Sequence, residues 1–189
     1  MTFAELATDQ GDLLCATAVA VTVAVWAWLY MSRLAAWAFV IAYLTTLVTT
    51  TGLKLVAMEV LPPLAGAGPM TLSQGAPSGH MALATVVYGT AALFCGKAGR
   101  SWRTVLCQAL CVAVIACVGF TRVELRNHTI ADVLAGLVMG GLALSFPAMV
   151  LRARPVQGRM LLGRLITTMA LVNIMFLLSG VRMPSSRFI

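Results

Sequence analysis

The chain holds two histidines, His80 and His128, and each lies in a short polar segment beside long apolar runs. Asp132 follows His128 by four residues, a spacing that places both side chains on one face of a helix. A carboxylate one turn away can accept a hydrogen bond from one imidazole nitrogen and leave the other nitrogen available as a nucleophile or a base. Asp132 also falls within an apolar run, where an ionisable group is costly and indicates a functional site. The pair therefore predicts nucleophilic or general-base chemistry.

The other histidine closes the segment Ala76-Pro77-Ser78-Gly79-His80, which enters an apolar run. Ser78 is a suitable N-cap, so we expect a helix to begin just after it. The first backbone N–H groups of a helix have no partners within it, and they favour an anion. His80 is then expected in the first turn, close to that anion.

Two cations lie near these segments. Arg122, six residues before His128, carries a fork of donors that matches phosphate oxygens, and Lys54 adds a point charge at the outer end of an earlier apolar run. Together with two histidines and backbone donors, these residue types suit phosphoryl transfer. Taken alone, His80 could be a surface group, and either cation an interfacial anchor. His128 and Asp132 could be a buried polar pair that holds helices together, but the shared location of all these groups favours a site.

The chain that carries these groups is too apolar for a water-soluble fold. Its 189 residues are 60% hydrophobic and 10% charged, whereas a soluble domain is about 25% charged. Such a chain cannot cover itself with a polar surface, so we expect an integral membrane protein. No polar segment is long enough for a separate domain, which predicts a single domain over residues 1–189. We assign the net charge of +7 to membrane topology and not to nucleic-acid binding, which needs a large polar face.

Six apolar runs are each long enough to cross about 30 Å of hydrocarbon as a helix of about 20 residues. They lie at about residues 13–31, 34–53, 79–96, 103–120, 129–151 and 160–180. The predicted fold class is therefore an all-α bundle of about six transmembrane helices. The start of the chain lacks the basic residues of a secretory signal, so we expect the first run to be a retained helix. Three glycines in the fifth run permit close helix approach: Gly136, Gly140 and Gly141.

The five cysteines lie within or beside the apolar runs. Their odd number and their spacing do not indicate a zinc site. They are predicted to be small packing residues of membrane helices: Cys15, Cys95, Cys107, Cys111 and Cys117.

Basic residues indicate how the bundle is oriented in the membrane. They gather in the links after the first, third and fifth runs: Arg33, Lys97, Arg100, Arg103, Arg152, Arg154 and Arg159. In the links after the second and fourth runs, acidic residues offset the basic ones, and the N-terminus is acidic. The positive-inside rule then places the N-terminus and both histidine segments outside the cytoplasm, although Arg182 and Arg187 in the C-terminal tail count against this.

The two histidine segments resemble motifs of a known family. Pro77-Ser78-Gly79-His80 is similar to the second signature of the type 2 phosphatidic acid phosphatase superfamily. Thr121-Arg122, five residues, His128, three residues and Asp132 resembles its third signature, with Thr in place of the usual Ser. The resemblance covers about residues 50–141, and these two motifs are specific in their order and spacing.

The resemblance implies a six-helix core and hydrolysis with no metal and no other cofactor. It implies that His128 attacks phosphorus and forms a phosphohistidine, that Asp132 orients His128, and that His80 protonates the leaving group. Water then hydrolyses the intermediate. The phosphate-binding residues that the resemblance implies are Lys54, Ser78, Gly79 and Arg122.

The first signature of that family departs from its usual pattern here. It is a Lys, six residues and then Arg-Pro, whereas Lys54 is followed after six residues by Leu61-Pro62. Leu61 thus lies where the family that this chain resembles has a phosphate-binding Arg. The contact that would be lost, one charge-assisted hydrogen bond to phosphate, is worth about 1.5–3 kcal/mol. We hypothesise that Arg126, two residues before His128, supplies the missing charge to the phosphate. Leu61 could instead mark a changed substrate or a protein that has lost hydrolysis.

The sequence therefore predicts an integral membrane lipid phosphatase that acts on the outer face of a bacterial inner membrane. The expected substrate is an amphiphile with its phosphate head at the water interface and its tail between helices. The candidates that the family offers are undecaprenyl diphosphate, phosphatidic acid, phosphatidylglycerol phosphate and lipid A phosphate, and the sequence does not choose among them. Two alternatives stay open, a lipid-to-lipid phosphotransferase and a non-catalytic lipid-binding or transport protein of the same fold.

Overall fold

The computed structural model describes residues 13–60, 76–97, 101–153 and 162–179, and within these ranges it is all-helical, as the sequence predicts. Its six helices are α2 (Leu13–Tyr30), α3 (Arg33–Val60), α4 (Gly79–Lys97), α5 (Trp102–Glu124), α6 (Ile130–Ala153) and α7 (Leu162–Ser179). Five of these described helices, α2 to α6, are long and apolar enough to cross a membrane, and α7 has a shorter apolar stretch, Leu165–Phe176. The chain is therefore an integral membrane helix bundle.

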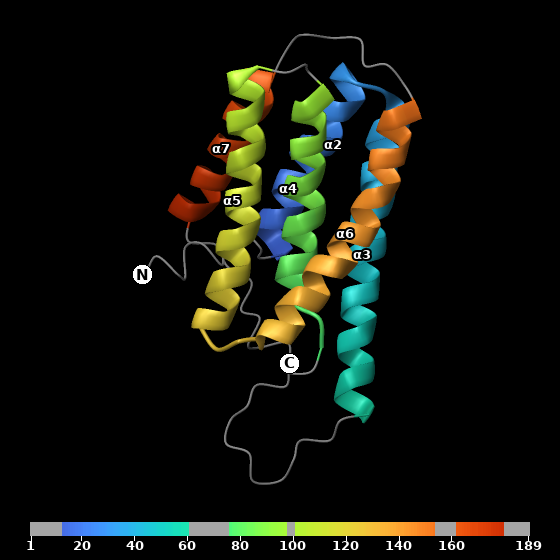
Figure 1. Cartoon of the computed structure of the whole chain (residues 1–189), viewed down its shortest axis with the longest axis vertical. Helices are drawn as coiled ribbons and strands as arrows, with labels where there is room; N and C mark the ends of the chain where they lie inside the picture. The colour runs from blue at the N-terminus through green and yellow to red at the C-terminus, as the bar shows by residue number, and fades with distance from the viewer. Residues whose placement is uncertain (1–12, 61–75, 98–100, 154–161, 180–189) are drawn as a thin grey trace.

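The centre of the bundle is α4 (Figure 1). It packs against α2, α3, α5 and α6, while α7 packs against α2. The sequence of α4 permits this position because it is rich in small residues and carries no charged side chain between His80 and Lys97. Every residue from Met81 to Ala91 is buried. The position of the first turn of α4 is therefore set by helices on several sides.

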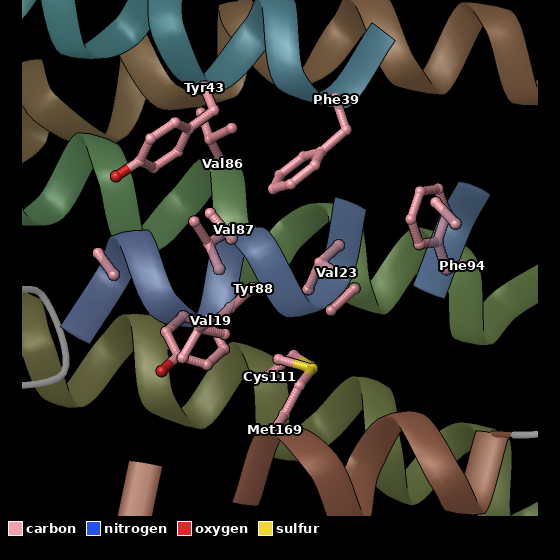
Figure 2. Packing of buried hydrophobic residues seen from close by; sticks show 14 of the residues in the cluster. Val19, Val23, Phe39, Tyr43, Val86, Val87, Tyr88, Phe94, Cys111 and Met169 are labelled. Carbon is pink, nitrogen blue, oxygen red and sulfur yellow. The ribbon is translucent and has the colours of Figure 1, made fainter. Parts of the chain in front are cut away.

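The hydrophobic core lies between α2, α3 and α4 and continues to α5 and α7 (Figure 2). It includes Val19, Val23, Phe39, Tyr43, Val86, Val87, Tyr88, Phe94, Cys111 and Met169. Trp26 of α2 stacks on Phe94 of α4, with ring centroids 5.9 Å apart. Aromatic side chains therefore pack the side of α4 that faces α2.

A polar cluster attaches α7 to the bundle. Oδ1 of Asn173 accepts a hydrogen bond from the hydroxyl of Tyr88 on α4 at 3.1 Å and from the thiol of Cys15 on α2 at 3.4 Å. Nδ2 of Asn173 donates to the carbonyl of Met169 at 2.9 Å. Because hydrocarbon offers these groups no partner, such bonds favour the docked position of α7.

Two helices extend further than the apolar runs predict. The apolar run at about residues 34–53 predicts a helix that ends near Lys54, and this end is wrong because α3 continues to Val60. The sequence has no helix breaker in this interval, and the chain meets its first proline only at Pro62. Similarly, α5 continues to Glu124, so Arg122 belongs to its last turn and not to a link.

The glycines of α6 differ in what surrounds them. A Cβ added at Gly136 would lie 2.5 Å from the carbonyl oxygen of Ser78, and one at Gly140 would lie 2.6 Å from the carbonyl oxygen of Ala82. The prediction of close helix approach is therefore confirmed for these two positions. It is wrong for Gly141, where nothing lies within 4 Å of an added Cβ.

The cysteines are not all packing residues. A disulfide links Cys95 near the end of α4 to Cys107 near the start of α5, with their Cα atoms 6.6 Å apart. The packing prediction is therefore wrong for this pair. Spacing could not reveal it, since the pairing depends on how α4 and α5 align across their short link. Cys15 and Cys111 are buried in the core, as expected.

Candidate active site

The predicted site residues that the structure describes come from one end of the bundle, where α5 ends and where α4 and α6 begin (Figure 1). His80 is the second residue of α4, Arg122 lies in the last turn of α5, and Asp132 lies in the first turn of α6. His128 lies in the short joint between α5 and α6. Lys54 projects from α3 and is half-buried. Leu61 lies outside the described residues.

The end of α5 fixes the backbone of His128. The N–H of Arg126 donates to the carbonyl of Val123 at 3.0 Å. The N–H of Asn127 donates to the carbonyl of Arg122 at 3.2 Å, which completes a Schellman motif. The N–H of His128 donates to the same carbonyl of Arg122, also at 3.2 Å. The helix end therefore holds the His128 backbone beside the turn that carries Arg122.

A capping box opens α6. The N–H of Thr129 donates to Oδ2 of Asp132 at 2.9 Å, and the N–H of Asp132 donates to Oγ1 of Thr129 at 3.2 Å. The same Oδ2 lies 3.8 Å from Nδ1 of His128, which is longer than a hydrogen bond. Catalytic hydrogen bonds are often long before a substrate binds. The carboxylate thus approaches Nδ1, and Nε2 is the imidazole nitrogen left for other chemistry.

A main-chain hydrogen bond joins the starts of α4 and α6. The N–H of Ser78 donates to the carbonyl of Asp132 at 2.9 Å. Ser78 is 0% exposed, and its Oγ accepts from the N–H of Met81 at 3.4 Å, which confirms Ser78 as the N-cap of α4. Gly136 lies one turn after Asp132, and its lack of a side chain allows the Ser78 carbonyl to approach. The two histidine-bearing segments are therefore in direct contact.

Two helix N-termini meet at this contact. The N–H groups of Gly79 and His80 occupy the first turn of α4, where helix geometry provides no partner within the helix. The N-terminal ends of α4 and α6 carry partial positive charge, which favours an anion there. Thr50 of α3, one turn before Lys54, borders the same place, because a Cβ added at Gly79 would lie 3.8 Å from its Oγ1. The backbone thus contributes to a candidate anion site that α3 borders on one side.

His128 is buried in the neutral form. The whole residue is 3% exposed, and neither ring nitrogen makes a hydrogen bond with the described residues. Burial lowers the pKa of His128 to about 4, the charges of Arg122 and Lys54 act in the same direction, and Asp132 opposes them. The charges of Arg122 and Lys54 also act on His80. At neutral pH His128 is therefore an unprotonated imidazole, and the charges of Arg122 and Lys54 act on both histidines.

Arg126 stands apart from this group. It has a positive φ of 55° and an exposed side chain. Among the described residues, the cations that act on His128 are Arg122 and Lys54. The phosphate contact of Arg126 therefore stays a prediction, and it requires the exposed guanidinium to reach toward the site from the Schellman motif.

Three residues at this end, Thr129, Thr50 and Gly136, have no predicted role in the site from the sequence. Thr129 had a signal, because a Thr followed three residues later by an acidic residue before an apolar run indicates a capping box. Thr50 had a weak one, since it lies four residues before Lys54 and so shares its helix face. Gly136 was predicted to permit close approach, but nothing in the sequence named the Ser78 carbonyl as the atom it meets.

One of three comparisons with known proteins finds a family. Residues 35–155 match the PAP2 superfamily. The chain belongs to the PAP2 superfamily. The comparisons with curated proteins and with solved structures find no match.

Membership of the PAP2 superfamily makes this chain a membrane phosphatase, of a family that is typically metal-independent. The matched range contains every predicted site residue from Lys54 to Asp132. Within the part of the chain that the structure describes, no group of three His, Cys, Asp or Glu side chains could hold a metal ion.

Proposed function

We propose that this PAP2 superfamily phosphatase hydrolyses the phosphate of a membrane lipid through a phosphohistidine on His128. The observation that carries the proposal is the placement of His128, which is buried and neutral, with a carboxylate on one side and two cations nearby. A histidine that only holds helices together would be expected to use its ring nitrogens in hydrogen bonds. The nitrogens of His128 make none with the described residues.

In the first step, Nε2 of His128 attacks phosphorus and the bond from phosphorus to the leaving oxygen breaks. Nδ1 keeps its proton and turns it toward Oδ2 of Asp132, so the positive charge that develops on the ring faces a carboxylate. With the anionic phosphate bound, His80 carries a proton, and it gives this proton to the leaving oxygen, which departs as an alcohol or as a lipid phosphate. His80 is then neutral and able to act as a base.

In the second step, water attacks the phosphohistidine. His80 takes the proton of this water, the bond from phosphorus to Nε2 breaks, and inorganic phosphate leaves. Both histidines then return to their starting protonation states. The proposed division of roles rests on position, since His128 has the adjacent carboxylate and His80 lies in the first turn of the neighbouring helix.

The phosphate oxygens are proposed to contact Lys54, Arg122 and the first turn of α4. Arg122 is buried in the last turn of α5, and Lys54 approaches from α3. Ser78 would contribute through its hydroxyl hydrogen, and Gly79 through its N–H. Preorganised donors of this kind stabilise the charge of the transition state because they need no reorganisation during the reaction.

The packing beneath the site bears on where the lipid tail lies. A Cβ added at Gly119 of α5 would be 3.2 Å from Sδ of Met81 and 3.2 Å from Cγ1 of Val133. Such contacts leave no room for a chain between α4, α5 and α6 at this level. Phe120 and Ile130 are exposed apolar residues on either side of the α5–α6 joint. We therefore propose that the tail lies in the bilayer against this outer face, in place of the expectation that it lies between helices.

The orientation proposed from the charges is that the histidine end faces the periplasm or exterior of a bacterial inner membrane. The opposite end carries Arg33 over the ring of Trp28, at 5.2 Å from its centroid, and Arg103 over Trp102, at 5.5 Å. Tryptophan and basic residues together are typical of the membrane–water boundary. The cations at the histidine end, in contrast, are used by the site.

The test is phosphate release by the purified protein from a panel of lipid phosphates, without added metal. The panel contains undecaprenyl diphosphate, phosphatidic acid, phosphatidylglycerol phosphate and lipid A phosphate. We expect release from at least one of them, its loss in His128→Ala, and its retention in Ser145→Ala, which removes an exposed hydroxyl of α6. A parent protein that releases phosphate from no lipid would refute the proposal.

A second arm separates hydrolysis from transfer to another lipid. Release of inorganic phosphate when no acceptor lipid is present supports the phosphatase. Phosphate that appears only on an added acceptor lipid, with none released, would instead identify a phosphotransferase with the same phosphohistidine.

A further inference from the structure

Thr129, the residue after the proposed nucleophile, holds Asp132 by two hydrogen bonds. Its N–H donates to Oδ2 of Asp132 at 2.9 Å, and its Oγ1 accepts from the N–H of Asp132 at 3.2 Å. The carbonyl of Asp132 accepts from the N–H of Ser78 at 2.9 Å. Both main-chain polar groups of Asp132 and one carboxylate oxygen are therefore fixed before any substrate binds.

The same carboxylate oxygen serves two neighbours. Oδ2 of Asp132 bonds to the N–H of Thr129 and lies 3.8 Å from Nδ1 of His128. A hydrogen bond needs a separation of about 3 Å, so a movement of under about 1 Å would bring Nδ1 and Oδ2 into range. The position of Oδ2 then depends on the cap, because the cap sets both the main chain and the rotamer of Asp132.

We propose that Thr129 is a positioning residue that aims Asp132 at Nδ1 of His128. Its hydroxyl fixes the main chain of Asp132, and its N–H fixes the carboxylate. This role rests on the proposed function, because it assigns Thr129 to the reaction of His128. A capping box that serves only helix stability would also contain these two bonds. Loss of a positioning role lowers kcat, whereas loss of a purely structural cap lowers the unfolding temperature.

The test compares Thr129→Gly with Thr129→Ser. Glycine is a good N-cap residue without a side-chain acceptor, so it keeps most of the helix stability while it removes the bond from Oγ1 to the Asp132 N–H. Serine retains that acceptor. The matched control is Thr22→Val, because the hydroxyl of Thr22 on α2 bonds to the carbonyl of Ala18 at 3.0 Å, within its own helix.

We expect Thr129→Gly to lower kcat by about 10- to 100-fold, in line with the cost of misplacing a catalytic group by about 1 Å. Its KM should stay within about twofold of the parent, because the phosphate contacts are intact. Thr129→Ser should restore kcat to within about threefold, and Thr22→Val should match the parent. Thermal unfolding of each variant shows whether any loss of kcat is a loss of folded protein.

A second readout does not require turnover. Orthovanadate, whose five-coordinate form resembles the transition state at phosphorus, is titrated into the same proteins. We expect it to bind Thr129→Gly at least about 10-fold more weakly than it binds the parent or Thr129→Ser, because it needs an oriented His128. If no lipid phosphate is hydrolysed, this titration still compares the variants, so the two proposals fail separately. Equal kcat or equal vanadate affinity in the parent and Thr129→Gly, or a loss that serine does not restore, would overturn the positioning role.

Discussion

Gly136 and Gly141 lie on the same helix, yet alanine should have opposite effects at the two positions. In a helix interior, alanine is favoured over glycine by about 0.5–1 kcal/mol because glycine loses more backbone entropy. Nothing lies within 4 Å of a Cβ at Gly141. Gly141→Ala should therefore raise the free energy of unfolding by about that amount and leave turnover unchanged.

At Gly136 the new methyl group meets main chain. Its carbon would lie 2.5 Å from the carbonyl oxygen of Ser78 and 3.1 Å from Cβ of Met81. A carbon–oxygen contact normally keeps about 3.3 Å, so the start of α4 must retreat by about 0.8 Å. Overpacking of this kind costs about 1–3 kcal/mol, which exceeds the gain in helix propensity.

The retreat also acts on the site. The N–H of Ser78 donates to the Asp132 carbonyl at 2.9 Å, and an added 0.8 Å or so takes this bond past the ordinary hydrogen-bond range of about 3.2 Å. His80 moves with the same turn. Since a misplacement of about 1 Å can cost about 100-fold in rate, we expect Gly136→Ala to lower kcat by about 10- to 100-fold.

The assay is phosphate release together with thermal unfolding in the same detergent. Gly140→Ala is a second control, because its Cβ would lie 2.6 Å from the carbonyl oxygen of Ala82, one turn further from the histidines. It should lower stability with a smaller effect on kcat. If Gly136→Ala kept both the stability and the kcat of the parent, the close contact of α4 with α6 would not be needed for the site.

Three further predictions concern other parts of the chain. Arg126→Gly should raise the unfolding temperature, because glycine adopts the positive φ of 55° without the strain of about 1–2 kcal/mol that a side chain brings. Both this change and Arg126→Ala should lower kcat/KM by about 10- to 100-fold if Arg126 contacts phosphate, and unchanged turnover in Arg126→Ala would refute that contact. Lys54→Met should move the acid limb of kcat/KM to higher pH. In the proposed mechanism the rate falls as His128 is protonated. The pKa of His128 is about 4 in the parent, because burial lowers it and the charges of Arg122 and Lys54 lower it further. An acid limb that does not move would show that the Lys54 charge does not lower this pKa. Asn173→Leu should lower stability by about 1 kcal/mol, because Asn173 bonds to Tyr88, and should keep kcat, which a parallel turnover assay checks.

The sequence predicted most of the helices because each apolar run matches the thickness of a membrane. It also predicted that His128 and Asp132 lie close together, although His128 lies in the joint before α6 and not on the helix face that the spacing suggests. Ser78 as N-cap followed from its residue type and from its place before an apolar run. Local patterns of this kind depend on neighbours in sequence, which is why they could be read there.

What the sequence did not predict depends on distant partners or on unusual residue choices. The apolar run before Lys54 predicts a helix that ends there, but a lysine does not break a helix, and α3 continues to Val60. No signal in the sequence marks the end of α5, because Arg126 occupies the position where a Schellman motif usually has glycine. The contact of Ser78 with Asp132 joins main-chain atoms, for which side-chain identity gives no signal.

The hydrogen bond from Ser78 to Asp132 also determines which parts of this protein could be transplanted. Because neither atom belongs to a side chain, evolution can change residues at both positions and keep the bond, proline at position 78 excepted. An engineer who grafts this candidate catalytic end onto another membrane bundle must therefore move four parts as one module: the first turns of α4 and α6, the α5–α6 joint, the last turn of α5 with Arg122, and the turn of α3 with Lys54. The far ends of the same helices, where a disulfide joins Cys95 of α4 to Cys107 of α5, lie outside that module.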